Sequence, residues 1–279
     1  MTHLQVVVTN TLHIPLLLSS VALLAECYRH LEPLSLRFIS GYSNIVVITA
    51  LSTLGHIAVF WVGGLILSIP LLLRLRGKVQ PKSIGCVCSG ISLVLFNSFL
   101  SLLLSVITFT YLLPCSLSRL PPTLSIIGNF MIFIPIEETL FFWIHFMFHR
   151  SKFLYKKIHK IHHTYTAPTA YQAVYAHPVE HILINIFPLL LGPVLMRAHV
   201  FEGVLWLGLA QLTTLVAHCG YVIPLIPTNP LHDLHHLHFR YNYGVLGVWD
   251  YLMGTLRTSE PDDIISGVDE SVKDQSKND

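Results

Sequence analysis

Long apolar runs constrain the fold of this chain more than any other feature. Residues 45–73 and 86–113 each exceed the roughly 20 apolar residues that cross the hydrocarbon core of a bilayer. A third run, 124–148, carries Glu137 and Glu138 inside it. Lipid offers the backbone no hydrogen-bond partner, so runs of this kind must form helices. The sequence therefore predicts an all-α integral membrane helical bundle.

Two shorter apolar segments follow the third run. They are 182–196 and 200–217, and the first is short for a full crossing at about 1.5 Å per residue. Pro188 and Pro193 are expected to bend it as well. We expect a hairpin that dips into the bilayer or just crosses it. The weakly apolar segment 11–25 fits either a span or an interfacial helix.

The composition agrees with a membrane protein. Hydrophobic residues make up 53% of the chain and charged residues 11%, against about 25% charged residues in a soluble domain. The net charge of +2 gives no indication of a nucleic-acid partner. The last residues, 258–279, are polar, and we expect them to be disordered. The predicted organisation is a membrane region 1–123, a catalytic region 124–257 and this tail.

Basic residues are distributed unevenly around the expected spans. The loop between the second and third spans carries a single arginine. The positive-inside rule therefore places 74–82 and 150–181 in the cytosol, and a hairpin at 182–217 returns 218–279 to the same side. The basic residues after the first and third spans are Arg74, Arg76, Lys78, Lys82, Arg150, Lys152, Lys156, Lys157 and Lys160.

Histidines are concentrated in one part of the sequence and repeat a spacing. Thirteen of the 17 lie between 145 and 238. They form the boxes HFMFH, HKIHH and HDLHH, and His218 stands apart in LVAHCGY. Histidines at i, i+3 and i+4 of a helix share one face. The boxed residues are His145, His149, His159, His162, His163, His232, His235 and His236.

This set of imidazoles indicates a metal site. Neutral imidazole binds iron, zinc or copper. A single catalytic zinc takes about three protein ligands, so eight or nine histidines are too many for one ion. Two ions with four or five nitrogens each use them all. We therefore predict that the eight boxed histidines and His218 bind two metal ions, and the repeated spacing disfavours a set of unrelated surface or core histidines.

The boxes and their surroundings resemble the fatty acid hydroxylase/sterol desaturase superfamily of membrane di-iron oxygenases. The resemblance extends over about 130–257 and is closest to the branch of the fatty acid hydroxylase domain-containing proteins and the C-4 methylsterol monooxygenases. The first 120 residues match only as generic spans. The segments that carry the resemblance are IEETLFFWIHFMFH, HKIHHTYTAP, VYAHPVEH, HCGYVIP, HDLHHLHF and GVLGVWDYLMGT.

The resemblance implies a function and its cofactors. We expect two iron ions, O₂ as co-substrate, and electrons from NAD(P)H through cytochrome b5 and its reductase as separate proteins. The expected location is the endoplasmic reticulum membrane, with the boxes facing the cytosol. The expected reaction is hydroxylation or oxidation of a C–H bond of a sterol, including a sterol methyl group, or of a fatty-acyl lipid in lipid or sterol biosynthesis. Desaturation uses the same metal site and stays open.

Other classes of function are less consistent with the sequence. A transporter should bind its ligands near the bilayer midplane between repeats, and we find no repeat. A non-catalytic metal-binding regulator of lipid metabolism should have lost box residues, whereas all eight are present. A zinc hydrolase would need the glutamate of an HExxH motif, which the boxes lack. We therefore predict an enzyme.

Carboxylates near the boxes are candidates for orienting the ligands. Glu138 lies two helical turns before His145 on the same stripe, and metal-bound imidazoles usually donate their other N–H to a carboxylate or carbonyl. Glu137 points about 100° away from that stripe on a 3.6-residue helix. Asp233, in the third box, and Asp250 could each orient a ligand or cap a helix.

Two further histidines stay unassigned. His177 follows the second box in AHPVEH, and His238 belongs to HHLHF. The resemblance places both near the site without deciding whether they bind metal.

Overall fold

A computed structural model of the protein describes residues 3–75, 80, 90–113, 119–221 and 230–258. Every element in these residues is a helix, which confirms the predicted all-α class. The tail from 259 onward and most of the basic loop 74–82 lie outside the described residues.

Six helical segments are long and apolar enough to cross a membrane. Three of them contain a stretch of π-helix, η1, η2 or η5, in line with the α-helical parts. The six are α1 (His3–Ile39), α2–η1–α3 (Asn44–His56, Ile57–Gly63, Gly64–Leu72), α4–η2 (Ile91–Ile107, Thr108–Leu112), α5 (Thr123–Arg150), α7–η5–α8 (Pro178–Glu180, His181–Ile186, Phe187–Leu195) and α9 (Val200–His218).

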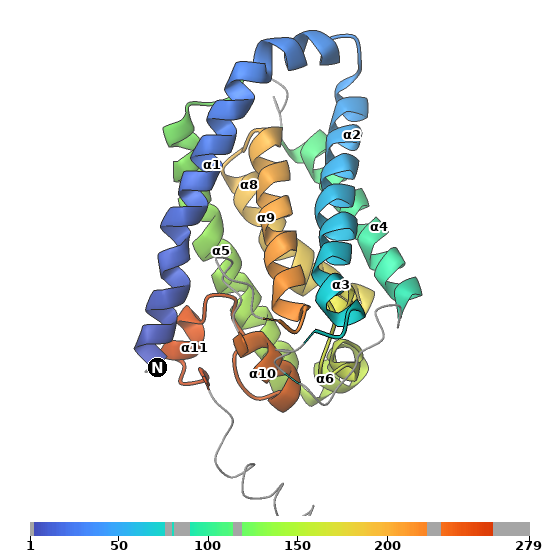
Figure 1. The fold of residues 1–279 in the computed structure, drawn as a ribbon, viewed down its shortest axis with the longest axis vertical. Coiled ribbons are helices and arrows are strands. Elements are labelled where there is room, and N and C mark those ends of the chain that lie inside the picture. Colours follow the sequence, from blue (N-terminus) through green and yellow to red (C-terminus); the bar gives the residue numbers. More distant parts are fainter. Residues whose placement is uncertain (1–2, 76–79, 81–89, 114–118, 222–229, 259–279) are drawn as a thin grey trace, which may run out of the picture.

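Short helices gather at one end of the long ones. Figure 1 shows α6, α10 and α11 together at the bottom of the view, where α5 ends and where the described N-terminus also lies. The short elements are α6 (Lys152–Lys157), η3 (His159–Thr164), η4 (Ala170–Val174), α10 (Pro230–His238) and α11 (Val248–Leu252). The structure is therefore a bundle of long helices closed at one end by a cap of short ones.

The structure answers the two open questions about the spans. The segment 11–25 lies inside α1, which is long enough for a span. The segment expected to be short starts at Pro178, so α7, η5 and α8 together reach 18 residues, and with α9 they form a hairpin of two candidate spans. Pro188 stands in the first turn of α8, directly after the π-helical η5.

Close contacts between helices form the core beneath the lipid-facing surface. Phe130 and Phe133 of α5 pack against Trp206 of α9, with Phe130 edge-on to the indole at 5.8 Å between ring centroids. Gly192 lets α8 approach α5, because a Cβ there would lie 2.9 Å from the Phe133 ring. Many large apolar side chains on the outside stay exposed, as lipid contact requires.

Candidate metal centre

All nine histidines predicted as metal ligands gather at the capped end of the bundle, in two adjoining clusters. Within each cluster, one nitrogen from every histidine lies within 4.8 Å of the others. The rings come from the end of α5, from η3, from the end of α9 and from α10. The five-histidine cluster is His145, His149, His159, His163 and His235, and the four-histidine cluster is His162, His218, His232 and His236.

The Nε2 atoms converge inside each cluster. In the five-histidine cluster, His159 Nε2 is 2.7 Å from His149 Nε2 and 3.0 Å from His163 Nε2. In the four-histidine cluster, His232 Nε2 is 2.9 Å from His218 Nε2. These are the separations of neighbouring ligands around one ion, because two nitrogens about 2.1 Å from a metal and at right angles are about 3 Å apart.

Main-chain carbonyls fix the outer nitrogens of five rings. A carbonyl only accepts, so each Nδ1 carries the proton and each Nε2 turns a lone pair toward its cluster. The pairs are His145 with Tyr243 (2.8 Å), His162 with Tyr175 (3.2 Å), His218 with Thr214 (2.8 Å), His235 with Tyr241 (2.6 Å) and His236 with Tyr165 (3.1 Å).

The donor set fits two transition-metal ions. Lone pairs that face one another at about 3 Å need a cation between them, and the buried His145 Nε2 has no hydrogen-bond partner among the described residues. Burial lowers the pKa of His162 to about 4 and the pKa values of His235 and His236 well below their usual range. These rings are thus neutral, which is the form that binds metal. Imidazole suits iron, zinc and copper alike.

The second and third boxes each contribute to both clusters. HKIHH forms the 3₁₀-helix η3 instead of the expected α-helix, and its three rings are divided between the clusters. His159 and His163 enter the five-histidine cluster, whereas His162 enters the other. On α10, His235 separates from His232 and His236 in the same way. The two clusters are therefore joined through both elements.

Glu180 is a site residue that the sequence analysis missed. Its Oε1 lies 2.8 Å from His159 Nδ1, and both side chains are almost completely buried. Glu180 ends the short helix α7, which brings it against η3. The available signal was an acidic residue between two histidines in AHPVEH, just after the second box.

Glu138 contacts a loop instead of a histidine. Its carboxylate accepts three backbone N–H groups between residues 245 and 248, at 2.8 to 3.2 Å. The outer nitrogen of His145 is already taken by the Tyr243 carbonyl, so the expected contact with Glu138 does not form. Glu138 instead holds residues 245–248, the loop that follows Tyr243.

Asp250 organises the start of the same loop. It accepts the N–H groups of Tyr243 at 2.8 Å and Gly244 at 2.7 Å, and the Thr255 hydroxyl at 2.6 Å. Its effect on His145 is thus indirect, through Tyr243. Asn242 was also missed: it adopts a left-handed backbone (φ 60°), and its amide donates to the carbonyls of two residues, Leu231 and Arg257.

The remaining candidates lie beside the clusters. Asp233 is buried on α10, and its Oδ1 accepts a hydrogen bond from Gln80 at 3.0 Å. His177 Nδ1 accepts the N–H of Val179 and so caps α7. Within the described part of the chain, neither His177 nor His238 belongs to a cluster. The role of Asp233 in orienting a ligand stays a prediction.

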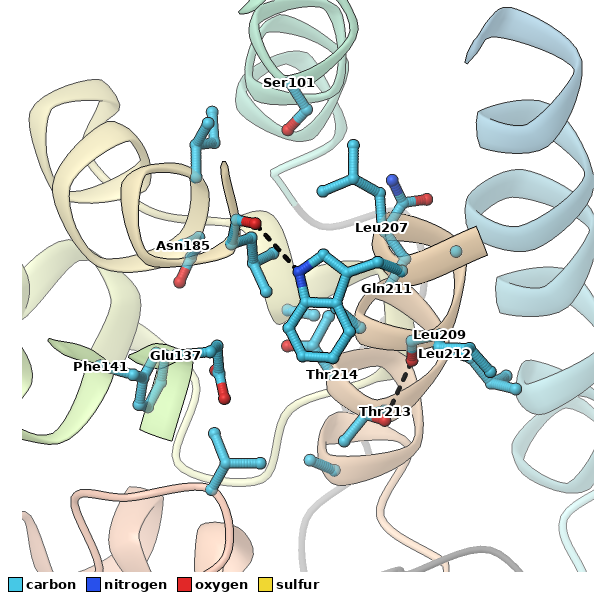
Figure 2. Close-up of a pocket in the computed structure, with 18 of the residues that line it drawn as sticks. Ser101, Glu137, Phe141, Asn185, Leu207, Leu209, Gln211, Leu212, Thr213 and Thr214 are labelled. Carbon is cyan, nitrogen blue, oxygen red and sulfur yellow. Dashed lines mark hydrogen bonds between the residues drawn. The ribbon is translucent and has the colours of Figure 1, made fainter. Parts of the chain in front are cut away.

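A cavity of about 440 Å³ extends from the histidines into the bundle. Rings from both clusters line it, including His145, His162 and His218. Its other walls are mostly apolar side chains, many of them from α9 and the rest from helices that include α1, α5, η5 and α8. Figure 2 shows Glu137 and Phe141 of α5 on one side of this space and Gln211 of α9 on the other. The cavity has the size and the mostly apolar lining of a small-molecule binding site.

Comparisons with known proteins match the same region. The fatty acid hydroxylase family model matches residues 130–255, which include all nine clustered histidines. Human fatty acid hydroxylase domain-containing protein 2 is 40% identical over 184 residues, covering 64% of this chain and 55% of that protein. The match thus spans about half the length of this relative.

Two further relatives carry other names. Methylsterol monooxygenase 1-1 of Arabidopsis thaliana is 38% identical over 105 residues, 38% of this chain and 35% of that protein. Very-long-chain aldehyde decarbonylase GL1-8 of Oryza sativa subsp. indica is 31% identical over 197 residues, 67% of this chain and 72% of that protein. No solved structure matches.

Proposed function

Because this chain belongs to the fatty acid hydroxylase family, we propose that it is a membrane-bound non-haem di-iron monooxygenase. Its substrate would be a sterol or a fatty-acyl lipid, oxidised at a C–H bond in lipid or sterol biosynthesis. The observation that carries the proposal is the pair of histidine clusters that opens into an apolar cavity. The names of the relatives favour lipid oxidation in general.

The two clusters would hold one iron each, with five and four imidazoles. When bound, the iron pair supplies the oxidising chemistry, with O₂ as co-substrate and electrons from NAD(P)H through cytochrome b5. The main-chain carbonyls keep each Nε2 free of protons and aimed inward. The carboxylate of Glu180, 2.8 Å from His159 Nδ1, would increase the donor strength of this ring.

The cavity would position the lipid and exclude water. Phe141 stacks edge-on against His145 at 5.4 Å between ring centroids, so an apolar wall reaches the histidines directly. The walls between α5 and α9 continue this surface into the membrane, where an acyl chain or a sterol body can lie. A carbon held at the histidine end is the carbon that reacts.

The basic residues favour a cytosolic position of the clusters. Lys152, Lys156, Lys157 and Lys160 are exposed on α6 and η3, beside the clusters, and the positive-inside rule places such residues in the cytosol. We place the protein in the endoplasmic reticulum membrane on this argument and on the family. The same lysines could contact an acidic electron donor or anionic headgroups.

The test is oxygen incorporation by the full chain in microsomes. We expect purified protein to hold about two irons per chain, and lipid extracts to gain one ¹⁸O atom from ¹⁸O₂ in the presence of NADPH and cytochrome b5. The double variant H162A/H163A should abolish this product, because it removes a ligand from each cluster. The control is H30A, since His30 is exposed on α1.

The outcomes separate the competing functions. An alkene without ¹⁸O would indicate desaturation on the same site. Iron-loaded protein that changes no lipid under any reductant would contradict the enzyme proposal and favour a metal-binding regulator.

A further inference from the structure

Polar side chains form one level of the cavity inside the membrane. Glu137 lies eight residues before His145 on α5, and Gln211 lies seven residues before His218 on α9. At 1.5 Å per residue, both are therefore about 11 Å further into the bundle than the histidines. Ser101 of α4 and Asn185 of η5 face the same space (Figure 2).

Three polar side chains that line the cavity have groups without a hydrogen-bond partner among the described residues. No described residue donates to Glu137, which lines the cavity, whereas the neighbouring Glu138 accepts three N–H groups. The Ser52 hydroxyl is buried without a partner in the described structure. Gln211 lies against His56, yet its Oε1 has no well-formed hydrogen bond. Polar groups left unpaired at membrane depth are unfavourable, so such groups usually have a binding or functional role.

The hydroxyl of Ser101 can donate a hydrogen bond to a ligand. His181 Nδ1 accepts a hydrogen bond from the Asn185 amide at 3.1 Å, so the proton of this ring is on Nε2. His181 Nε2 is 3.0 Å from the Asn97 carbonyl and 2.8 Å from Ser101 Oγ. The single Nε2–H of His181 is therefore shared between the Asn97 carbonyl and Ser101 Oγ, and the hydroxyl proton of Ser101 is left for a ligand in the cavity.

The charge of this level excludes anionic lipids. Among the described residues that line the cavity there is no lysine or arginine, and Glu137 is acidic. A fatty-acid carboxylate or a phosphate would meet another acid with no cation beside it. A hydroxyl both donates and accepts, so it can pair with Glu137 whether or not that carboxyl carries its proton.

We propose that Glu137 binds the hydroxyl group of a neutral lipid alcohol, and that this contact selects alcohols over fatty-acid anions. Ser101 and Gln211 add polar groups to the same cavity. This proposal rests on the proposed function for the reaction that follows binding. The binding of the alcohol itself is inferred from the cavity alone.

The test measures binding, without turnover, to full-length metal-loaded protein in nanodiscs. The probes are oleyl alcohol, its methyl ether and oleate, and cholesterol with its methyl ether. We expect at least one alcohol to bind about tenfold more tightly than its ether, which corresponds to one lost hydrogen bond. Oleate should bind more weakly than oleyl alcohol. Comparison of cholesterol with oleyl alcohol shows whether the cavity accepts a sterol ring system or an acyl chain.

Variants at position 137 assign the preference to this residue. E137L should remove the tenfold difference between alcohol and ether, whereas E137Q, which still donates and accepts, should keep it within about threefold. The control F141L changes the same wall one turn away without a polar group, and should affect alcohol and ether equally. E137M repeats the comparison if E137L does not fold.

The results that overturn the proposal are distinct from those that overturn the monooxygenase. Ethers that bind as tightly as the alcohols, oleate that binds more tightly than oleyl alcohol, or an unchanged preference in E137L would each overturn it. Because position 137 is two turns from the histidines, iron content should equal that of the wild type in every variant at this position. Absence of ¹⁸O incorporation would count against the monooxygenase alone.

Discussion

Where the partner of a clustered imidazole is described, it contacts the ring nitrogen that faces away from the cluster. Five outer nitrogens donate to main-chain carbonyls, whereas His159 faces the carboxylate of Glu180. Charge on this partner strengthens the ring as a ligand more than a carbonyl does. Glu180 is therefore the outer residue whose removal should affect metal binding most directly.

The variant E180Q tests this role of Glu180. Loss of the charge beside His159 should weaken iron binding about tenfold or more, measured by competition with a chelator. The matched control is E202Q, because Glu202 is also buried in a spanning helix but pairs with Asn129 at 2.9 Å, away from the histidines. Equal iron affinity in E180Q and E202Q would contradict the assignment.

The loop at 242–250 should depend strongly on Asp250. D250A removes acceptors for two backbone N–H groups and one hydroxyl, and leaving buried donors unpaired should lower the free energy of unfolding by about 3 kcal/mol. T255V removes one of these bonds and should cost about 1 kcal/mol. Thermal denaturation in detergent measures both, and a D250A loss no larger than that of T255V would contradict the role.

At the scale of single residues, the histidines that cluster could be predicted from the sequence. The groups that contact their outer nitrogens could not. Spacing within the boxes was enough to single out eight of the nine histidines that cluster, and the ninth, His218, stands outside the boxes. Carbonyls such as that of Tyr243 belong to every residue, so no sequence pattern marks the ones that hold a ring. Glu138 was assigned to His145 because both lie on one helical stripe, and the competing loop donors come from residues 107 to 110 positions away.

At the scale of elements, the apolar runs predicted the spans, and local backbone form was harder to predict. The HKIHH box forms a 3₁₀-helix, and η5 is a π-helix directly before Pro188. Both forms depend on contacts with neighbouring helices, which periodicity does not contain. The start of α7 at Pro178, which lengthens the hairpin, was hidden because polar residues precede its apolar run.

The approach of α8 to α5 should depend on Gly192. A Cβ there would meet the Phe133 ring at 2.9 Å and its backbone at 3.1 Å, so G192A should destabilise the fold by about 1–3 kcal/mol. G128A is the control, because a Cβ at Gly128 in α5 meets nothing within 4 Å. Thermal denaturation of the two variants should rank G192A below G128A, and the reverse order would contradict the contact.

At the scale of the whole molecule, the clusters join helices that are distant in sequence. The ends of α5 and α9 meet η3 and α10 at the histidines and their carbonyl partners, at this end of the bundle. The boundary expected at 123–124 between a membrane region and a catalytic region stays a prediction, since α1 also packs against α5.

Metal removal should loosen one end of the protein selectively. Without cations, the facing lone pairs repel, so chelation should increase hydrogen exchange in η3 and α10. The first turns of α5, on the opposite end of the bundle, should exchange as before (Figure 1). Hydrogen-exchange mass spectrometry with and without chelator measures this, and uniform loosening of all helices would contradict a local role of the metals.

The division of HKIHH and HDLHH between the two clusters has a consequence for assembly. An ion bound by His159, His163 and His235 would hold η3 against α10, and would thereby keep His162, His232 and His236 in place for the second ion. We therefore expect the two ions to load cooperatively, so that singly occupied protein is scarce.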